Sequence, residues 1–173
     1  MTMKKMILLI VGLGLAFTAY QAIGSAKEKK DDLPEGVLGL TKEEWKQRLT
    51  PLEYKVIWEE GTERAFTGDL LNNKEKGVYV TVGCKQPVFH SDQKYDSKTG
   101  WPSFWQPISQ DAIEEKADYK LGVKRIEVVG SQCGEHLGHV FEDGPPPTGL
   151  RYCINSAALD FIPQEEFDKQ QNK

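Results

Sequence analysis

Residues 133–159, CGEHLGHVFEDGPPPTGLRYCINSAAL, contain the densest group of chemically reactive side chains in the 173-residue chain. They hold two of the three cysteines and two of the three histidines, and an arginine stands two positions before the second of these cysteines. The triple proline at 145–147 fits neither a helix interior nor a central strand, so we expect a rigid loop from Gly144 to Gly149. Such a loop returns the chain and places one thiol opposite two imidazoles.

This arrangement makes Cys153 a candidate nucleophile. His136 and His139 are three positions apart, so in an extended or turn conformation their side chains can converge on one point. A thiol attacks as the thiolate, and a nearby guanidinium such as that of Arg151 lowers its pKa. The same spacing also fits a buried structural cysteine beside two core histidines, and at this point the residues leave both interpretations open.

Length and charge narrow the class of protein. A chain of 173 residues suffices for one domain with a substantial core. The net charge of -4 offers no basic surface of the kind that nucleic-acid binding needs, so we expect no nucleic-acid partner. Glycine-rich phosphate loops and the dinucleotide fingerprint are absent from the sequence, which argues against a nucleotide cofactor.

The N-terminal segment has the pattern of a secretory signal. Lys4 and Lys5 precede an apolar run from residue 6 to 19, and small residues follow at 24–26. We expect export to the periplasm or another extracytoplasmic compartment, with cleavage after Ala26 favoured over retention as a membrane anchor. Residues 27–39 are charged and contain Pro34 and Gly36, which indicates a linker, and residues 40–173 are then a single folded domain.

Short elements follow one another through this domain. Thr41 with Glu44, and Thr50 with Glu53, have the form of capping boxes and predict two short helices, the second ended by Gly61. A last helix is expected from about Pro163. Between these helices, β-branched and aromatic runs predict short strands in antiparallel sheets, at 78–83, 86–89, 124–130, 139–141 and 150–159.

Three further motifs accompany the opening stretch: GTERAFTG (61–68), KYDSKTGWPSF (94–104) and NSAALDF (155–161). In this order, and with HLGHVF at 136–141, they resemble the methionine-R-sulfoxide reductase B family, and the likeness covers residues 40 to 167. The resemblance implies a mainly β (α+β) fold of two antiparallel sheets with a few peripheral helices. It also implies thiol-dependent reduction of the R epimer of methionine sulfoxide, free or in oxidised proteins, with no bound cofactor. We expect the protein to be a monomer.

The resemblance also assigns roles to single residues. Cys153 matches the nucleophile, which would become a sulfenic acid, and Arg151 would favour its thiolate. The paired histidines would donate protons to the sulfoxide oxygen or orient a water that does, Asn155 would orient the site, and Trp101 would pack against the substrate methyl; the residues so assigned are Cys153, His136, His139, Asn155, Arg151 and Trp101. Phe66 and Phe141 are interpreted as wall or core residues outside the site.

Two features depart from the family pattern, the zinc ligands and the resolving cysteine. Many members hold a structural zinc with two Cys-x-x-Cys pairs, but the pairs here read Thr81 with Cys84 and Gly130 with Cys133, so we expect no metal and hypothesise a structural disulfide between Cys84 and Cys133.

The usual resolving cysteine is replaced by Thr99. We therefore expect an external dithiol, such as a thioredoxin-like protein, to regenerate Cys153, with recruitment of Cys84 or Cys133 as the alternative. Two other functions are weighed: a non-catalytic binding module on the same fold, and a cysteine hydrolase, for which no oxyanion hole or orienting acid is evident.

Overall fold

The computed structural model describes residues 39–172. The expected signal segment at 1–26 and nearly all of the expected linker at 27–39 lie outside the described residues. Within residues 39–172, none of the helices is long and apolar enough to cross a membrane.

Both expected N-terminal helices are present, and each begins with its capping box. In α1 (Lys42–Arg48) and α2 (Pro51–Glu59), the side chain of the threonine before the helix accepts a hydrogen bond from the backbone N–H of the third helical residue. That third residue is a glutamate, and its side chain accepts a hydrogen bond from the backbone N–H of the threonine. The left-handed residue that ends α2 is Glu60, with φ of 52°, rather than Gly61, whose N–H donates to the Lys55 carbonyl at 2.9 Å. The predicted last helix is α3 (Gln164–Gln171), with Glu165 and Glu166 in its first turn.

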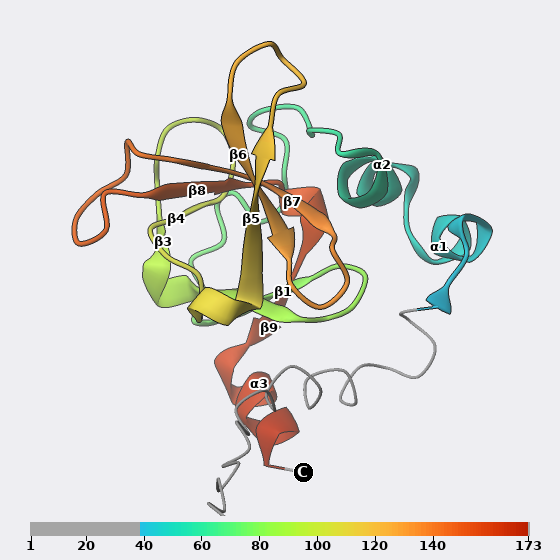
Figure 1. Cartoon of the computed structure of the whole chain (residues 1–173). Coiled ribbons are helices and arrows are strands. Elements are labelled where there is room, and N and C mark those ends of the chain that lie inside the picture. Colours follow the sequence, from blue (N-terminus) through green and yellow to red (C-terminus); the bar gives the residue numbers. More distant parts are fainter. Residues whose placement is uncertain (1–38, 173) are drawn as a thin grey trace, which may run out of the picture.

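The strands form two antiparallel sheets, which confirms the predicted fold class (Figure 1). The smaller sheet has the order β2-β1-β9 and the larger one the order β3-β4-β8-β7-β6-β5. The strand bounds are β1 (Gly77–Thr81), β2 (Pro87–His90), β3 (Lys94–Tyr95), β4 (Ser103–Phe104), β5 (Ile113–Asp118), β6 (Arg125–Gly130), β7 (His136–Phe141), β8 (Arg151–Ile154) and β9 (Leu159–Pro163).

The expectation of one strand over 150–159 is wrong. The chain leaves the larger sheet after Ile154, forms a short 3-10 turn at Ser156–Ala158, and enters the smaller sheet as β9. The physical reason is the carboxylate of Glu63, which accepts hydrogen bonds from the N–H groups of Ser156 at 2.6 Å and Ala157 at 2.9 Å. Those two N–H groups are therefore unavailable for strand pairing, and the chain crosses from one sheet to the other here.

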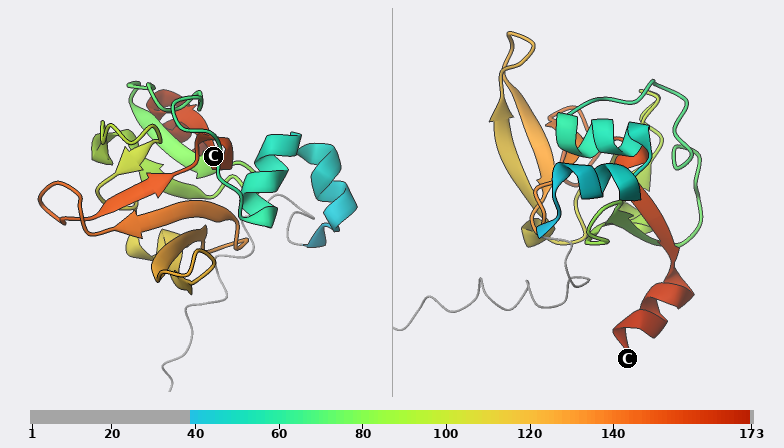
Figure 2. Two further views of the ribbon diagram at one scale, coloured as in Figure 1. Left: turned by 90° about the horizontal axis from the view of Figure 1, so that it is seen from above. Right: turned by 90° about the vertical axis from the view of Figure 1, so that its right-hand side faces the viewer.

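The core lies between the two sheets and combines aliphatic side chains with a cluster of aromatic rings. Phe89 of β2 stacks on Phe104 of β4 with ring centroids 4.4 Å apart, and Tyr79 of β1 meets the same Phe104 ring edge-on at 5.0 Å. A smaller cluster of Trp45, Tyr54 and Cys84 lies under α1 and α2. The two helices therefore cover one end of the sheets, whereas α3 and the β5–β6 hairpin project from the body (Figures 1 and 2).

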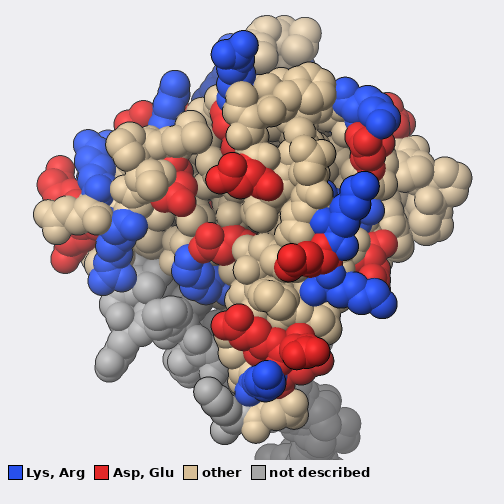
Figure 3. All heavy atoms as spheres, turned by 180° about the vertical axis from the view of Figure 1, so that it is seen from behind, with Lys and Arg blue, Asp and Glu red and all other residues tan. Residues whose placement is uncertain are grey.

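The surface charges are mixed. On the face in Figure 3, Lys and Arg side chains lie among Asp and Glu over the described part of the chain, without a continuous patch of either sign.

Candidate active site

The register of the larger sheet aligns the reactive side chains across neighbouring strands. Cys153 of β8 lies opposite Ser103 of β4 on one side and His139 of β7 on the other, and His139 in turn lies opposite Glu127 of β6. Residues directly opposite in an antiparallel pair have Cβ atoms about 4.5–5.5 Å apart on the same face. The thiol, an imidazole and a carboxylate thus form one row.

A bulge in β7 brings the second histidine to the same face. In a regular strand, residues three apart point to opposite faces. Here the pairing steps from Val128 with Gly138 to Val129 with His136, so β7 carries an extra residue, Leu137, against one step of β6. The ring centroids of His136 and His139 consequently lie 5.6 Å apart, in an edge-on arrangement.

A cavity of about 140 Å³ opens on this face. It brings together four of the residues assigned to the site from the sequence and four that were not: the first are Trp101, His139, Cys153 and Asn155, and the others are Thr62, Arg125, Gly138 and Phe141. Phe141 therefore belongs to the site wall, which corrects the expectation that it lies outside. Phe66 is 68% exposed and is not a core residue either.

Each histidine is held by a carboxylate that the sequence analysis did not identify. His136 Nδ1 lies 2.6 Å from Glu127 Oε1, and His139 Nε2 lies 2.8 Å from Asp118 Oδ2. Burial lowers the pKa of His136, and the Glu127 carboxylate partly opposes that shift. The same Asp118 oxygen accepts from Arg125 Nη2 at 2.6 Å.

Asp118 is itself strongly stabilised as the anion. Hydrogen bonds from the Lys120 N–H and from His139, together with the charge and hydrogen bond of Arg125, lower the pKa of Asp118 to about 2. The ionised carboxylate of Asp118 beside His139 fixes the orientation of the imidazole ring. Both imidazoles are thus oriented by acids before a substrate enters.

Burial governs the titration of Cys153. It raises the pKa of the thiol, while hydrogen bonds and charge from Thr99 and Arg151 act in the opposite direction. The expected effect of Arg151 on the thiolate is present, but it is smaller than the effect of burial. Cys153 is consequently a thiol in the resting protein near neutral pH, and thiolate formation requires loss of a proton to a neighbouring base.

Arg151 does not line the cavity. Its guanidinium makes two hydrogen bonds of 2.8 Å to the carboxylate of Asp143 and lies 4.5 Å from the centre of the Phe141 ring. Arg151 therefore fixes the ring that forms one wall, and it also favours the Cys153 thiolate.

The loop at 61–68 is joined to the site through Glu63, which is buried. The Trp101 indole N–H donates to the Glu63 carbonyl at 3.2 Å, and the Glu63 N–H donates to Asn155 Oδ1 at 3.1 Å. The Asn155 amide group also donates to the Leu137 carbonyl at 3.0 Å. Both polar atoms of Asn155 are therefore engaged by the main chain, and Asn155 positions the Trp101 loop and the β7 bulge relative to each other.

The other two cysteines lie away from this cavity. Cys84 and Cys133 form a disulfide with Cα atoms 6.5 Å apart, so Cys153 is the only free thiol in residues 39–172. Their sulfurs and a carboxylate oxygen of Glu135 lie within 4.8 Å of one another. These groups do not fit the zinc of the related family, because zinc binds thiolates and both sulfurs are bonded to each other. The Glu135 carboxylate is also occupied, since it accepts the N–H groups of Gly83 and Cys84.

Thr99 lies beside the reactive sulfur. Its hydroxyl is 3.9 Å from Cys153 Sγ and 2.8 Å from the Ser97 hydroxyl, which in turn contacts the Ser103 hydroxyl at 2.7 Å. A cysteine at position 99 would stand against Cys153, and the hydroxyl there supplies a hydrogen bond but no second sulfur.

Comparison with known proteins assigns the chain to a family. Residues 49–163 match the SelR domain. A peptide methionine sulfoxide reductase MsrB from Methanosarcina barkeri is 57% identical over 126 residues, which cover 73% of this chain and 89% of that protein. A protein of the same name from Leptospira interrogans is 53% identical over 119 residues, covering 69% of this chain and 91% of its own length.

A mouse protein, methionine-R-sulfoxide reductase B3, mitochondrial, is 46% identical over 147 residues. This match covers 85% of the present chain and 56% of the mouse protein. The SelR match over residues 49–163 contains every strand of both sheets.

Proposed function

This chain belongs to the methionine-R-sulfoxide reductase B family and reduces methionine-R-sulfoxide in a thiol-dependent reaction, and we propose that Cys153 is the thiol that does so. One observation carries the assignment of the residue. The only free thiol of residues 39–172 opens into a cavity that also contains an indole and a carboxylate-bound imidazole. The activity makes the protein an oxidoreductase that acts on oxidised methionine in proteins.

The cavity suits a methyl sulfoxide. Trp101 offers a flat apolar wall for the terminal methyl group, and its ring is held in place by the hydrogen bond to Glu63. Phe141 extends the apolar surface, while His139 and Arg125 supply polar groups on another side. A substrate seated with its methyl group on the indole would direct its sulfoxide oxygen toward the imidazole, which supports selection of one epimer.

The first chemical step transfers one oxygen atom. The Cys153 thiolate attacks the sulfoxide sulfur as the sulfoxide oxygen accepts a proton, which forms a transient sulfur–sulfur bond. That bond and the sulfur–oxygen bond of the substrate then break as the oxygen is transferred to the sulfur of Cys153. The products are methionine and a cysteine sulfenic acid. The substrate sulfur gains two electrons and the cysteine sulfur loses them.

The two histidines provide the proton. His139 lies opposite Cys153 in the sheet, so it can accept the thiol proton and return it to the sulfoxide oxygen, with Asp118 stabilising the imidazolium between the two events. His136 contacts the His139 ring and is hydrogen-bonded to Glu127, whose charge favours its imidazolium against burial, and we propose it as the second acid. We assign Asp118 and Glu127 as positioning residues, because each acts through a histidine.

Regeneration is assigned to an external dithiol such as a thioredoxin-like protein. One thiol of the reductant attacks the sulfenic acid to release water and form a mixed disulfide, and its second thiol displaces Cys153. Two observations support this route over an internal one: Thr99 occupies the position of the resolving cysteine, and Cys84 and Cys133 are bonded to each other.

We further propose that the protein is exported and acts as a monomer. The signal pattern at 1–26 supports export, with membrane anchoring by the uncleaved segment as the alternative. A disulfide between Cys84 and Cys133 agrees with an oxidising compartment. Counting alkylatable thiols in the denatured, unreduced protein tests this point: one thiol is expected, and three would contradict the disulfide.

Turnover of separated epimers tests the proposed role of Cys153. With dithiothreitol as reductant, the purified protein should release methionine from the R epimer of a blocked methionine sulfoxide and not from the S epimer. Cys153→Ser should abolish this turnover while leaving the thermal unfolding of the protein cooperative. Binding of the R epimer without turnover would instead favour the non-catalytic module, and full activity in Cys153→Ser would exclude Cys153 as the nucleophile.

A further inference from the structure

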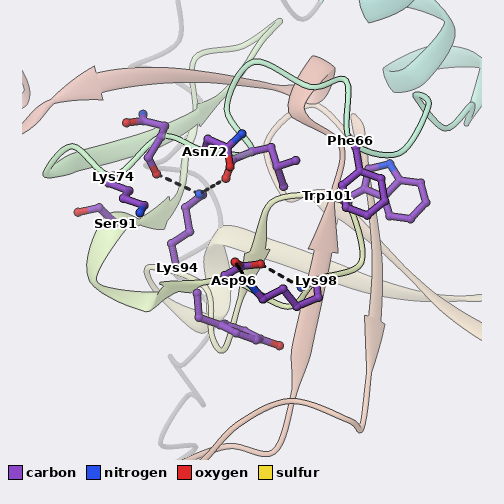
Figure 4. Close-up of a pocket in the computed structure, with 12 residues that line it drawn as sticks. Phe66, Asn72, Lys74, Ser91, Lys94, Asp96, Lys98 and Trp101 are labelled. Atoms are coloured by element: carbon purple, nitrogen blue, oxygen red, sulfur yellow. Dashed lines mark hydrogen bonds and ion pairs between the residues drawn. The ribbon is translucent and has the colours of Figure 1, made fainter.

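A second and larger hollow lies beside the reactive cavity. It has a volume of about 540 Å³ and shares one wall, Trp101, with the cavity that contains Cys153 (Figure 4). We call it the basic groove, and define it by Phe66, Lys74, Lys94, Asp96, Lys98 and Trp101. A methionine sulfoxide seated against the indole would have the rest of its polypeptide emerging next to this groove.

The groove carries an excess of positive charge. It contains three lysines against a single aspartate, whereas the whole chain has a net charge of -4. Lys98 pairs with Asp96 at 2.6 Å, but Lys74 is exposed and forms no ion pair among residues 39–172. A local concentration of cations on an acidic protein attracts anionic groups selectively to this surface.

Lys94 forms the floor of the groove. Its ammonium group donates to the carbonyls of Leu71 at 2.7 Å and Asn73 at 3.0 Å, which leaves one of its three donors unused by these contacts (Figure 4). These bonds also fix the loop that bears Lys74. The lysine side of the basic groove is therefore preorganised, so a ligand does not have to order it on binding.

Phe66 closes the end of the groove nearest Trp101. It is 68% exposed, and its backbone has the left-handed φ of 66° that bulky residues rarely adopt. Its N–H donates to the Gly100 carbonyl at 2.8 Å, and a Cβ at Gly100 would approach the Phe66 ring to 2.9 Å. Strained backbone that holds an aromatic ring in solvent is typical of ligand-contacting positions, because the exposed ring gains its burial only when something binds.

We propose that the basic groove binds the segment of substrate polypeptide that adjoins the methionine sulfoxide, and that it favours segments rich in Asp and Glu. This inference rests on the proposed function. Phe66 and Trp101 would hold the main chain next to the oxidised residue, and Lys74 would meet a carboxylate further along. The reductase would accordingly repair oxidised methionines in acidic surroundings faster than those in basic surroundings.

Competition between charged peptides tests the proposal. We would measure kcat/KM, with dithiothreitol, for three substrates containing the R epimer: a peptide with aspartates on both sides, the same peptide with lysines, and a blocked single amino acid. The acidic peptide should exceed the basic one by roughly fivefold or more at low salt, about the effect of one well-placed surface ion pair. The difference should shrink at high salt because exposed charges are screened.

A charge reversal and a matched control locate the effect. Lys74→Glu leaves two lysines against two acids in the groove and should therefore abolish the preference for the acidic peptide, and the ratio of the two rates within one preparation is insensitive to any loss of folded protein. Lys116→Glu removes a lysine of β5 that pairs with Glu114 outside the groove, and it should leave the order as in the wild type.

The outcomes separate this proposal from the proposed function. Equal rates for the two peptides in an enzyme that reduces the blocked amino acid would overturn the groove proposal alone. An unchanged order in Lys74→Glu would overturn it as well. Failure to reduce the blocked amino acid would count against the proposed function.

Discussion

Glu127 should set the acidity of His136, and Glu127→Gln tests this directly. The Oε1 atom of Glu127 lies 2.6 Å from His136 Nδ1, and the side chains are 14% and 4% exposed. A hydrogen bond between charged groups contributes about 1.5–3 kcal/mol, against about 0.5–1.5 kcal/mol for a neutral one. Glutamine keeps the shape of the side chain and one hydrogen-bond acceptor, so the interaction with His136 loses about 1–2 kcal/mol, which corresponds to a factor of roughly 5–30 in an equilibrium or rate constant.

The sign of the pH effect follows from the cause of the shift. Burial lowers the pKa of His136 and Glu127 partly opposes this, so removal of the charge lowers the pKa further. Less imidazolium is then present at neutral pH. We expect kcat at pH 7 to fall by about 5- to 30-fold, and the alkaline limb of the kcat profile to move toward lower pH.

The assay is kcat at saturating blocked R epimer from pH 5 to 9, with dithiothreitol in excess. Glu114→Gln on the edge strand β5 is the control, since Glu114 is exposed and outside the cavity. An unchanged pH profile in folded Glu127→Gln would refute the role of His136 as an acid tuned by this carboxylate.

Three further predictions concern other groups. Thr99→Cys should form a disulfide with Cys153 after one turnover without reductant, because the Thr99 hydroxyl lies 3.9 Å from the sulfur; mass spectrometry showing a persistent sulfenic acid instead would contradict this. Arg151→Ala should raise the pKa of Cys153 further, so the midpoint of iodoacetamide alkylation against pH should move upward, and a downward move would show that Arg151 does not favour the thiolate. Burial raises the pKa of Glu135 in the folded protein. The protonated Glu135 side chain therefore contributes to the free energy of unfolding below the pKa of an unfolded glutamate, and this contribution is lost as the pH rises through the pKa of Glu135 in the folded protein. Glu135→Gln should remove this decline from urea midpoints measured between pH 4 and 8.

Local signals predicted the helices and most strands. The capping boxes at Thr41 and Thr50 act over three residues, so sequence alone fixes where α1 and α2 begin. β5 was not predicted because its sequence, IEEKAD, consists largely of helix-favouring residues, and it forms a strand by pairing with β6 along its whole length. Strand pairing with β6 therefore outweighs the helical preference of the β5 sequence.

The reactive residues were predictable by type, whereas their partners depend on the register of the sheet. Cys153 and the two histidines stand out because thiols and imidazoles are rare in this chain. Asp118 and Glu127 reach the histidines only through the pairing of β5, β6 and β7 and through the bulge at Leu137, and no local pattern marks either carboxylate. Glu63 lies 93 residues from the Ser156 N–H that it accepts, so its role could not be inferred from the motif that contains it.

Mass spectrometry of Cys153 after a single turnover tests the central claim most directly. The protein would be mixed with one equivalent of the R epimer in the absence of any reductant, and the sulfenic acid would be trapped with dimedone. We predict one methionine released per protein and one trapped adduct on Cys153, with neither product from the S epimer. Release of methionine with Cys153 unmodified would contradict the account.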